Sequence, residues 1–152
     1  MTCSCCGEDR DPATLATLSA PQQVSICRNC IGWLARRAGS ADSTPILPVR
    51  DLDEAVTFYE RAGFDARRYD GGGFAFVTYH DVSVFDLDWS EQLDVAANRS
   101  GCYLIVAKVD EWHAELAGKG FALSELSDQP WGMREFTLTD PSGNYVRIGR
   151  NT

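Results

Sequence analysis

The chain has 152 residues, of which 44% are hydrophobic, and a formal net charge of −8 at neutral pH. No apolar run approaches the ~20 residues of a membrane span, and no secretion signal opens the chain, so neither is expected. The acidic balance disfavours nucleic acid as a partner and favours cationic ligands, although a solvated surface would also explain it. The six cysteines fit a reducing cytoplasm.

The charge is divided unevenly along the chain. Residues 1–42 hold four basic and four acidic side chains, so the remaining 110 residues carry the whole excess of acid. We therefore expect two units, residues 1–42 and residues 43–152. The first is too short to bury a stable core alone, whereas a bound metal would supply the missing stabilisation.

Two cysteine pairs dominate the first unit. They read Cys3-Ser4-Cys5-Cys6 and Cys27-Arg28-Asn29-Cys30, with twenty residues between them. Four thiolates complete the tetrahedral shell that Zn²⁺ prefers, so the spacing predicts a structural zinc site at Cys3, Cys6, Cys27 and Cys30 with no open position for a substrate. A redox pair is the alternative. Cys5 could replace Cys3 or Cys6 as a ligand.

The elements around these pairs suggest how the first unit folds. Residues 24–26 alternate like a short strand, and residues 31–38 have helical spacing with Gly39 as a stop. A cysteine pair at a helix start, facing a second pair in a knuckle, is typical of a treble clef. Cys-Ser-x-Cys-Gly followed by Val-x-Ile-Cys-x-x-Cys-Ile resembles the zinc-binding domain of the ClpX unfoldase. That resemblance implies a module that dimerises and docks a protein partner.

The remainder of the chain repeats one pattern twice, after a linker at residues 39–43. A strand at 45–49, a helix capped by Asp51 or Asp53 and ended by Gly63, and strands at 66–69, 74–79 and 82–87 come first. A strand at 102–108, a helix at 109–118, and strands at 122–126, 134–139 and 145–149 follow. The predicted fold class is therefore α+β, built from paired βαβββ modules.

This repeat and its motifs resemble the vicinal-oxygen-chelate superfamily of glyoxalase I, extradiol dioxygenases and bleomycin-resistance proteins. The resemblance rests on Pro-Ile-Leu-Pro-Val-Arg-Asp-Leu-Asp-Glu-Ala-Val-Thr-Phe-Tyr at 45–59 and on Asp-Pro-Ser-Gly-Asn at 140–144. These motifs imply a fold and leave the activity open.

The enzymes of that superfamily hold a divalent ion with His, Gln or Glu, and the matching positions here suit such an ion poorly. They fall on Thr44, Val84, Cys102 and Arg147. We expect Cys102 to be a small core side chain, His80 to lie in a turn and His113 to be exposed on a helix. A metal-dependent glyoxalase-like or dioxygenase-like enzyme is therefore kept as an alternative.

Residues 128–136, Asp-Gln-Pro-Trp-Gly-Met-Arg-Glu-Phe, are most similar to bleomycin-resistance proteins, with Met133 as an inserted residue. The resemblance implies a homodimer that sequesters an unmodified cationic aromatic drug in two clefts at the subunit interface. It places ligand-binding aromatic side chains at Tyr69, Phe74, Tyr103 and Trp131. Trp89 is a further candidate because of its own position, directly after Asp88. Asp86 and Asp88, after the fourth strand, would add negative charge near the groove.

Several alternatives stay open. Each ring could pack in the core instead, Phe74 above all. Pro45 matches a proline where the first strand exchanges between subunits, so dimerisation is expected. The functions compared are a binding protein of the bleomycin-resistance type, a metal-dependent enzyme, and an adaptor whose zinc module docks a partner while the second unit senses a ligand.

Overall fold

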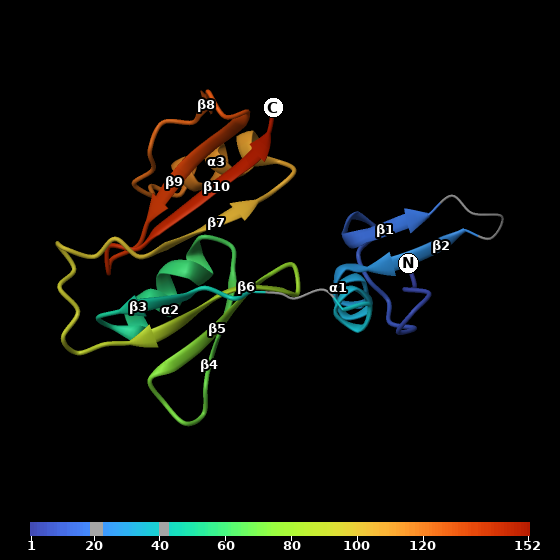
Figure 1. Cartoon of the computed structure of the whole chain (residues 1–152), viewed down its shortest axis with the longest axis horizontal. Helices are drawn as coiled ribbons and strands as arrows, with labels where there is room; N and C mark the ends of the chain where they lie inside the picture. Colours follow the sequence, from blue (N-terminus) through green and yellow to red (C-terminus); the bar gives the residue numbers. More distant parts are fainter. Residues whose placement is uncertain (19–22, 40–42) are drawn as a thin grey trace.

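The computed structural model describes residues 1–18, 23–39 and 43–152. Its first part is a small hairpin and a helix (Figure 1). The turn η1 (Pro12–Thr14) leads into β1 (Leu15–Leu18), which pairs antiparallel with β2 (Val24–Cys27), and α1 (Arg28–Arg37) follows at once. The predicted helix thus begins three residues earlier than expected. The predicted linker at 39–43 lies mostly outside the described residues.

Two modules of identical strand order make up the rest of the chain. The first comprises β3 (Ile46–Val49), α2 (Leu52–Arg61), β4 (Asp65–Arg68), β5 (Phe74–Tyr79) and β6 (Val82–Trp89). The second comprises β7 (Gly101–Ile105), α3 (Val109–Gly118), β8 (Ser127–Gln129), β9 (Met133–Thr139) and β10 (Tyr145–Asn151). Their sheets run β3-β6-β5-β4 and β7-β10-β9-β8, and in each the first strand is parallel to the last. The predicted α+β fold with paired βαβββ modules is confirmed.

One predicted strand is wrong. Residues 122–126 form no ladder, because only Leu123 bridges to Leu138, and β8 lies further on. Leu123 and Leu126 still pack against the core, although residues three apart would point to opposite faces of a strand. Ser124 replaces part of the ladder, since its Oγ accepts the backbone N–H of Thr137 at 2.8 Å.

Local signals explain the ends of α2. Asp51 is the residue that caps it, because its carboxylate accepts the backbone N–H of Glu54 at 3.0 Å. Gly63 ends it with φ +96°, a conformation that a residue with a Cβ rarely adopts. The apolar side chains Ala55, Val56 and Tyr59 are buried, so α2 presents this stripe to its sheet.

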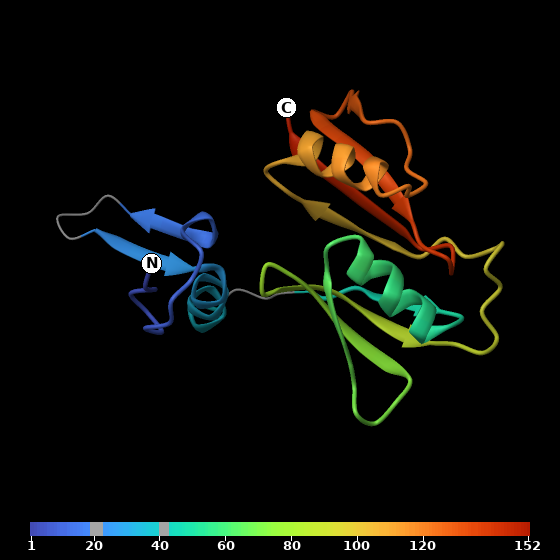
Figure 2. The ribbon, with the colours of Figure 1, turned by 180° about the vertical axis from the view of Figure 1, so that it is seen from behind.

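Both module helices lie on the same side of the two sheets (Figure 2). One apolar cluster fills the space beneath them and joins the modules, because Phe64 of the first contacts Trp112 of the second at 5.4 Å between ring centroids. The inward residues of the central strands are fully buried; they are Ala75, Val77, Phe85, Leu87, Phe136, Leu138, Val146 and Ile148. Because both helices lie on one side, no helix of the described residues covers the opposite face of either sheet (Figure 2). Strand alternation presents the remaining side chains of each strand on that face.

The turn between β9 and β10 forms a buried polar network. Asp140 Oδ1 accepts the backbone N–H groups of Ser142 and Asn144, and Asp140 Oδ2 accepts the Asn144 amide and the Tyr59 hydroxyl, all at 2.8–2.9 Å. Asn144 also donates to the backbone oxygen of Pro48 at 2.8 Å. The Asp-Pro-Ser-Gly-Asn motif therefore ties the second sheet to α2 and β3.

No helix in the described ranges is long and apolar enough to cross a membrane.

The first part of the chain contacts the first module at the β5–β6 turn, where Arg10 Nη1 donates to Asp81 at 3.0 Å. His80 and Asp81 both have positive φ there, so the predicted turn is confirmed.

Candidate functional site

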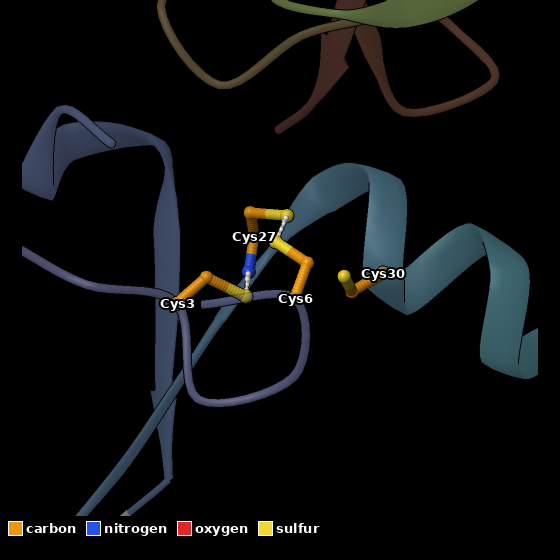
Figure 3. Close-up of side chains that lie close together, drawn as sticks. All are labelled: Cys3, Cys6, Cys27 and Cys30. Atoms are coloured by element: carbon orange, nitrogen blue, oxygen red, sulfur yellow. Dashed lines mark hydrogen bonds between the residues drawn. The ribbon is translucent and has the colours of Figure 1, made fainter. Parts of the chain in front are cut away.

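Four cysteine thiols from three backbone segments converge in the first part of the chain (Figure 3). Cys3 and Cys6 come from the N-terminal turn, Cys27 ends β2, and Cys30 lies in the first turn of α1. The four sulfur atoms all lie within 4.8 Å of one another. Thiolates on a tetrahedral Zn²⁺ lie about 3.8 Å apart, so a small contraction would suit such an ion. The four cysteines are thus close enough to hold a metal.

The fifth cysteine of this region is not one of the four. Cys5 is exposed and lies outside the sulfur group.

The backbone favours the ionised form of Cys3, because the N–H of Cys27 donates to Cys3 Sγ at 3.3 Å, and the pKa of Cys3 is lowered to about 6. Burial instead raises the pKa of Cys30. A bound cation would oppose this cost of burial and favour all four thiolates.

The open face of the first sheet carries aromatic and acidic side chains in adjacent rows. Phe74 is paired across the sheet with Asp88, and Phe76 with Asp86. The rings of Phe74 and Phe76 meet edge to face at 5.4 Å, and Tyr69 meets Phe76 at 6.4 Å. The sequence predicted four of these residues as ligand-binding and missed Phe76, although its alternation with Ala75 and Val77 places it on the same face as Phe74.

The two acids lie within β6, rather than after it as the sequence suggested. Asp88 is exposed, whereas Asp86 is partly buried and burial raises its pKa. Its Oδ1 atom is buried and has no hydrogen-bond partner in the described part of the chain. A buried acceptor without a hydrogen bond lowers the stability of the folded protein, and a donor that reached it would recover part of that free energy. Trp89, the further aromatic candidate, ends the same strand and is exposed.

The open face of the second sheet brings Tyr103 and Trp131 to one carboxylate. Glu135 is only 6% exposed, and its Oε2 accepts the Tyr103 hydroxyl at 2.5 Å and the Trp131 indole N–H at 3.4 Å. Arg147 lies 3.6 Å from the other oxygen of Glu135. Burial, and then the hydrogen bond to Glu135, raises the pKa of Tyr103 to about 12, so this hydroxyl remains a donor at neutral pH.

A glycine makes room for this arrangement. Gly149 is paired with Glu135 on one side and Ile105 on the other, and a Cβ there would clash with the Tyr103 hydroxyl and lie 2.9 Å from Glu135 Cβ. Two hollows adjoin the same face. One of about 510 Å³ is lined by Ala122, Leu123, Ser124, Thr137, Thr139, Tyr145 and Arg147, and one of about 340 Å³ includes Trp131 and Glu135. Tyr103 is 39% exposed and Trp131 is 62% exposed, so part of each ring remains accessible.

Replacing Glu135 with glutamine is expected to weaken its hold on the Tyr103 hydroxyl and the Trp131 indole. The amide has no charge and one acceptor oxygen, so the pKa of Tyr103 should fall from about 12 toward its ordinary value of 10. An NMR titration that follows the Tyr103 Cζ signal measures this change. Glu125→Gln is the matched control, because Glu125 lines the same hollow as Trp131 and is exposed. An unchanged Tyr103 titration in the Glu135 variant would contradict this assignment.

The family to which the chain belongs is shown by its sequence. The family model described as "Glyoxalase/Bleomycin resistance protein/Dioxygenase superfamily" matches residues 40–148. The chain belongs to this superfamily. The match begins after the four cysteines, so these lie outside the superfamily's own pattern.

Relatives within the superfamily include drug-binding proteins. A bleomycin resistance protein of Klebsiella pneumoniae is 28% identical over 119 residues, covering 72% of this chain and 91% of its own length. The crystal structure of a bleomycin-binding protein complexed with bleomycin is 26% identical, with a TM-score of 0.67, covering 74% of this chain and all of that one. A bleomycin-binding protein from Streptomyces verticillus, complexed with copper(II)-bleomycin, is 28% identical with a TM-score of 0.62, covering 74% and 98%.

The positions at which superfamily enzymes were expected to hold a metal are scattered here among different surroundings. Thr44 is exposed before β3, whereas Val84 and Cys102 pack against the core, where burial raises the pKa of Cys102 to about 12. Arg147 lies on the open face beside Glu135. Within the described residues, the four cysteines are the group of metal-binding side chains that come together.

One histidine differs from expectation. His113 is partly buried rather than exposed, because its ring packs edge to face on Phe136 at 4.9 Å and its Nε2 lies 3.3 Å from the backbone oxygen of Ser124. The cause is the course of residues 122–126, which pass over this side of α3. His113 thus helps to hold the segment that lacks a ladder.

Proposed function

We propose that the protein binds a cationic aromatic small molecule of the bleomycin type and sequesters it without modifying it. The supporting observation is that the predicted aromatic residues lie on the two sheet faces that no helix covers, beside carboxylates. Flat rings stack on such side chains, and positive charge is attracted both to their faces and to Asp86 and Asp88. The excess of acid in residues 43–152 would draw the ligand in.

A homodimer would complete the binding groove. Phe74 belongs to β5 of the first sheet, and Tyr69 directly follows β4 of the same sheet. Tyr103 belongs to β7 of the second sheet, and Trp131 lies in the turn between β8 and β9. Each copy therefore offers two partial sites. In one, the aromatic side chains lie beside Asp86 and Asp88, and in the other, Tyr103 and Trp131 donate to Glu135. We propose that the first sheet of one copy faces the second sheet of its partner, so that a dimer forms two equivalent clefts.

A titration with metal-free bleomycin tests this function. We expect saturable binding at one ligand per subunit, and Trp131→Ala should weaken it by about 30-fold, as for an aromatic hot spot worth ~2 kcal/mol. Isothermal calorimetry measures both. Trp33→Ala is the control, because Trp33 is an exposed tryptophan of α1, outside both sheets. No binding at micromolar concentrations would contradict the proposed function.

We propose that the chain consists of two domains. Residues 1–42 form a treble-clef-like structural zinc module, with Cys3, Cys6, Cys27 and Cys30 as ligands. Residues 43–152 form a separate binding domain. A cytoplasmic location would keep these thiols reduced. The module cysteines close the coordination shell of zinc, so the ion would stabilise the fold rather than perform chemistry.

An adaptor role for the module is a second proposal, and one observation favours it. Ile31, Trp33 and Leu34 of α1 are each more than 40% exposed and form apolar surface on a short helix. A protein partner that buries these side chains would lose its site when the module unfolds, while binding of the small molecule would persist.

A further inference from the structure

The open face of the first sheet contains a row that crosses three strands. Arg67 of β4 is paired with Phe76 of β5, which is paired with Asp86 of β6. Neighbouring strands are about 4.8 Å apart, so a cation, a ring and a carboxylate stand side by side in this order. Tyr69 and Phe74 lie one step along the same face, within ring contact of Phe76.

The cation of this row is held by a ring instead of a carboxylate. The Arg67 guanidinium carbon lies 4.9 Å from the centroid of Phe76, and no ion pair or side-chain hydrogen bond joins Arg67 to another described residue. Its neighbour Arg68 points to the other side and donates twice to Asp53, at 2.7 and 2.9 Å. Of two adjacent arginines, one is paired and the other stacks on the surface that we propose binds cations.

One oxygen of the acid in this row lacks a partner. Asp86 Oδ1 is buried without a hydrogen bond, although Arg67 lies on the other side of the same ring. Arg67 stacks on Phe76 and Asp86 Oδ1 is unpaired, so a third group could still donate a hydrogen bond to Asp86. A positively charged group that entered over Phe76 would contact the ring as Arg67 does now and would also donate to Asp86.

We propose that the face of Phe76 beside Asp86 is the subsite for the cationic end of a ligand, and that Arg67 covers this face until the ligand displaces it. The inference rests on the proposed function and adds a ligand class to it, an ammonium, amidinium or guanidinium group. Arg67 acts as a resident competitor. A weak or neutral ligand does not displace it, so this arginine makes the groove selective for cations.

Calorimetry on side-chain variants tests the role of Arg67. Removing the competitor in Arg67→Gln should tighten binding of metal-free bleomycin by about two- to fivefold, the equivalent of one exposed cation–π contact. Arg67→Lys retains a cation that can stack and should stay near the original affinity. Arg68→Gln is the control and should leave affinity unchanged. Asp86→Asn removes the charged acceptor and should weaken binding by about tenfold.

NMR of the arginine side chains separates this inference from the proposed function. In the free protein, the Nε–H signal of Arg67 should be shifted upfield by the Phe76 ring, and saturating bleomycin, or agmatine as a small guanidinium probe, should move it to the position of a free arginine. If agmatine displaces Arg67 but bleomycin does not bind, the subsite is supported and the proposal that the protein binds bleomycin is wrong. Bleomycin binding with an unmoved Arg67 signal and an unchanged Arg67→Gln affinity would overturn the subsite alone. If neither probe moves the signal, the inference is wrong.

Discussion

Replacing Cys27 and Cys30 together with serine is expected to unfold the first 39 residues while the two βαβββ modules stay folded. The side chains buried in the described part of this segment are Cys3, Ser25 and Cys27, so it has no hydrophobic core of its own. Structural zinc contributes about 10–16 kcal/mol of apparent binding energy in small modules, which no other contact here could replace. The effect should therefore be complete rather than graded.

Two-dimensional ¹H–¹⁵N NMR and elemental analysis measure this outcome. Signals from β1, β2 and α1 should collapse to unfolded positions, and one bound metal per chain should be lost. Cys5→Ser is the matched control, because Cys5 lies between the same ligands but is exposed and outside the sulfur group. If the double variant kept a dispersed spectrum for this segment, packing and hydrogen bonds would be sufficient to fold it, and the structural-metal proposal would be wrong.

Replacing Asp140 with alanine should destabilise the binding modules by about 3–5 kcal/mol, because four buried donors lose their acceptor at once. The donors are two backbone N–H groups, the Asn144 amide and the Tyr59 hydroxyl. For modules of this size we expect the melting temperature to fall by more than about 10 °C. Thermal unfolding followed by circular dichroism measures it.

Two further variants separate the network from an ordinary turn. Asp94→Ala removes a carboxylate that also accepts two backbone N–H groups, those of Ala96 and Ala97, but in an exposed turn. Its cost should stay near 0.5 kcal/mol, since water replaces the lost acceptor. Tyr59→Phe removes a single donor and should cost about 1 kcal/mol. Equal losses for Asp140→Ala and Asp94→Ala would show that burial of the network contributes nothing.

Much of the fold could be predicted because local chemistry determines it. Asp51 and Gly63 mark the ends of α2, and the expected range of α3 agrees with the structure. The segment at 122–126 could not be assigned correctly, since a short run with two leucines is compatible both with a strand and with a loop packed on the core. Which of them forms depends on β9, and the sequence does not specify that pairing locally.

The sequence indicated several side chains of the candidate site, but it missed Phe76 and Glu135 and gave none of the contacts between them. A resemblance to known proteins placed Tyr103 and Trp131, yet their shared acceptor Glu135 depends on the register of β9 and β10 and on the missing side chain of Gly149. Likewise, Phe76 could be assigned to the face of Phe74 by alternation, whereas its stacking with Arg67 depends on which strand neighbours β5. The periodicity of a strand sequence predicts which sheet face a side chain lies on. Which side chains it contacts depends on the pairing of the strands.

The parallel pairing of the first and last strands also determines when each module can fold during translation. In each sheet the last strand lies between the first strand and the third, so β10 separates β7 from β9. The first module has all its strands once residue 89 has left the ribosome, and it can fold while the second is still being made. The second must wait for residues 145–151, and until then β7 and β9 are two exposed edges with no common neighbour. Nascent chains stalled before β10 should therefore be the aggregation-prone species of this protein.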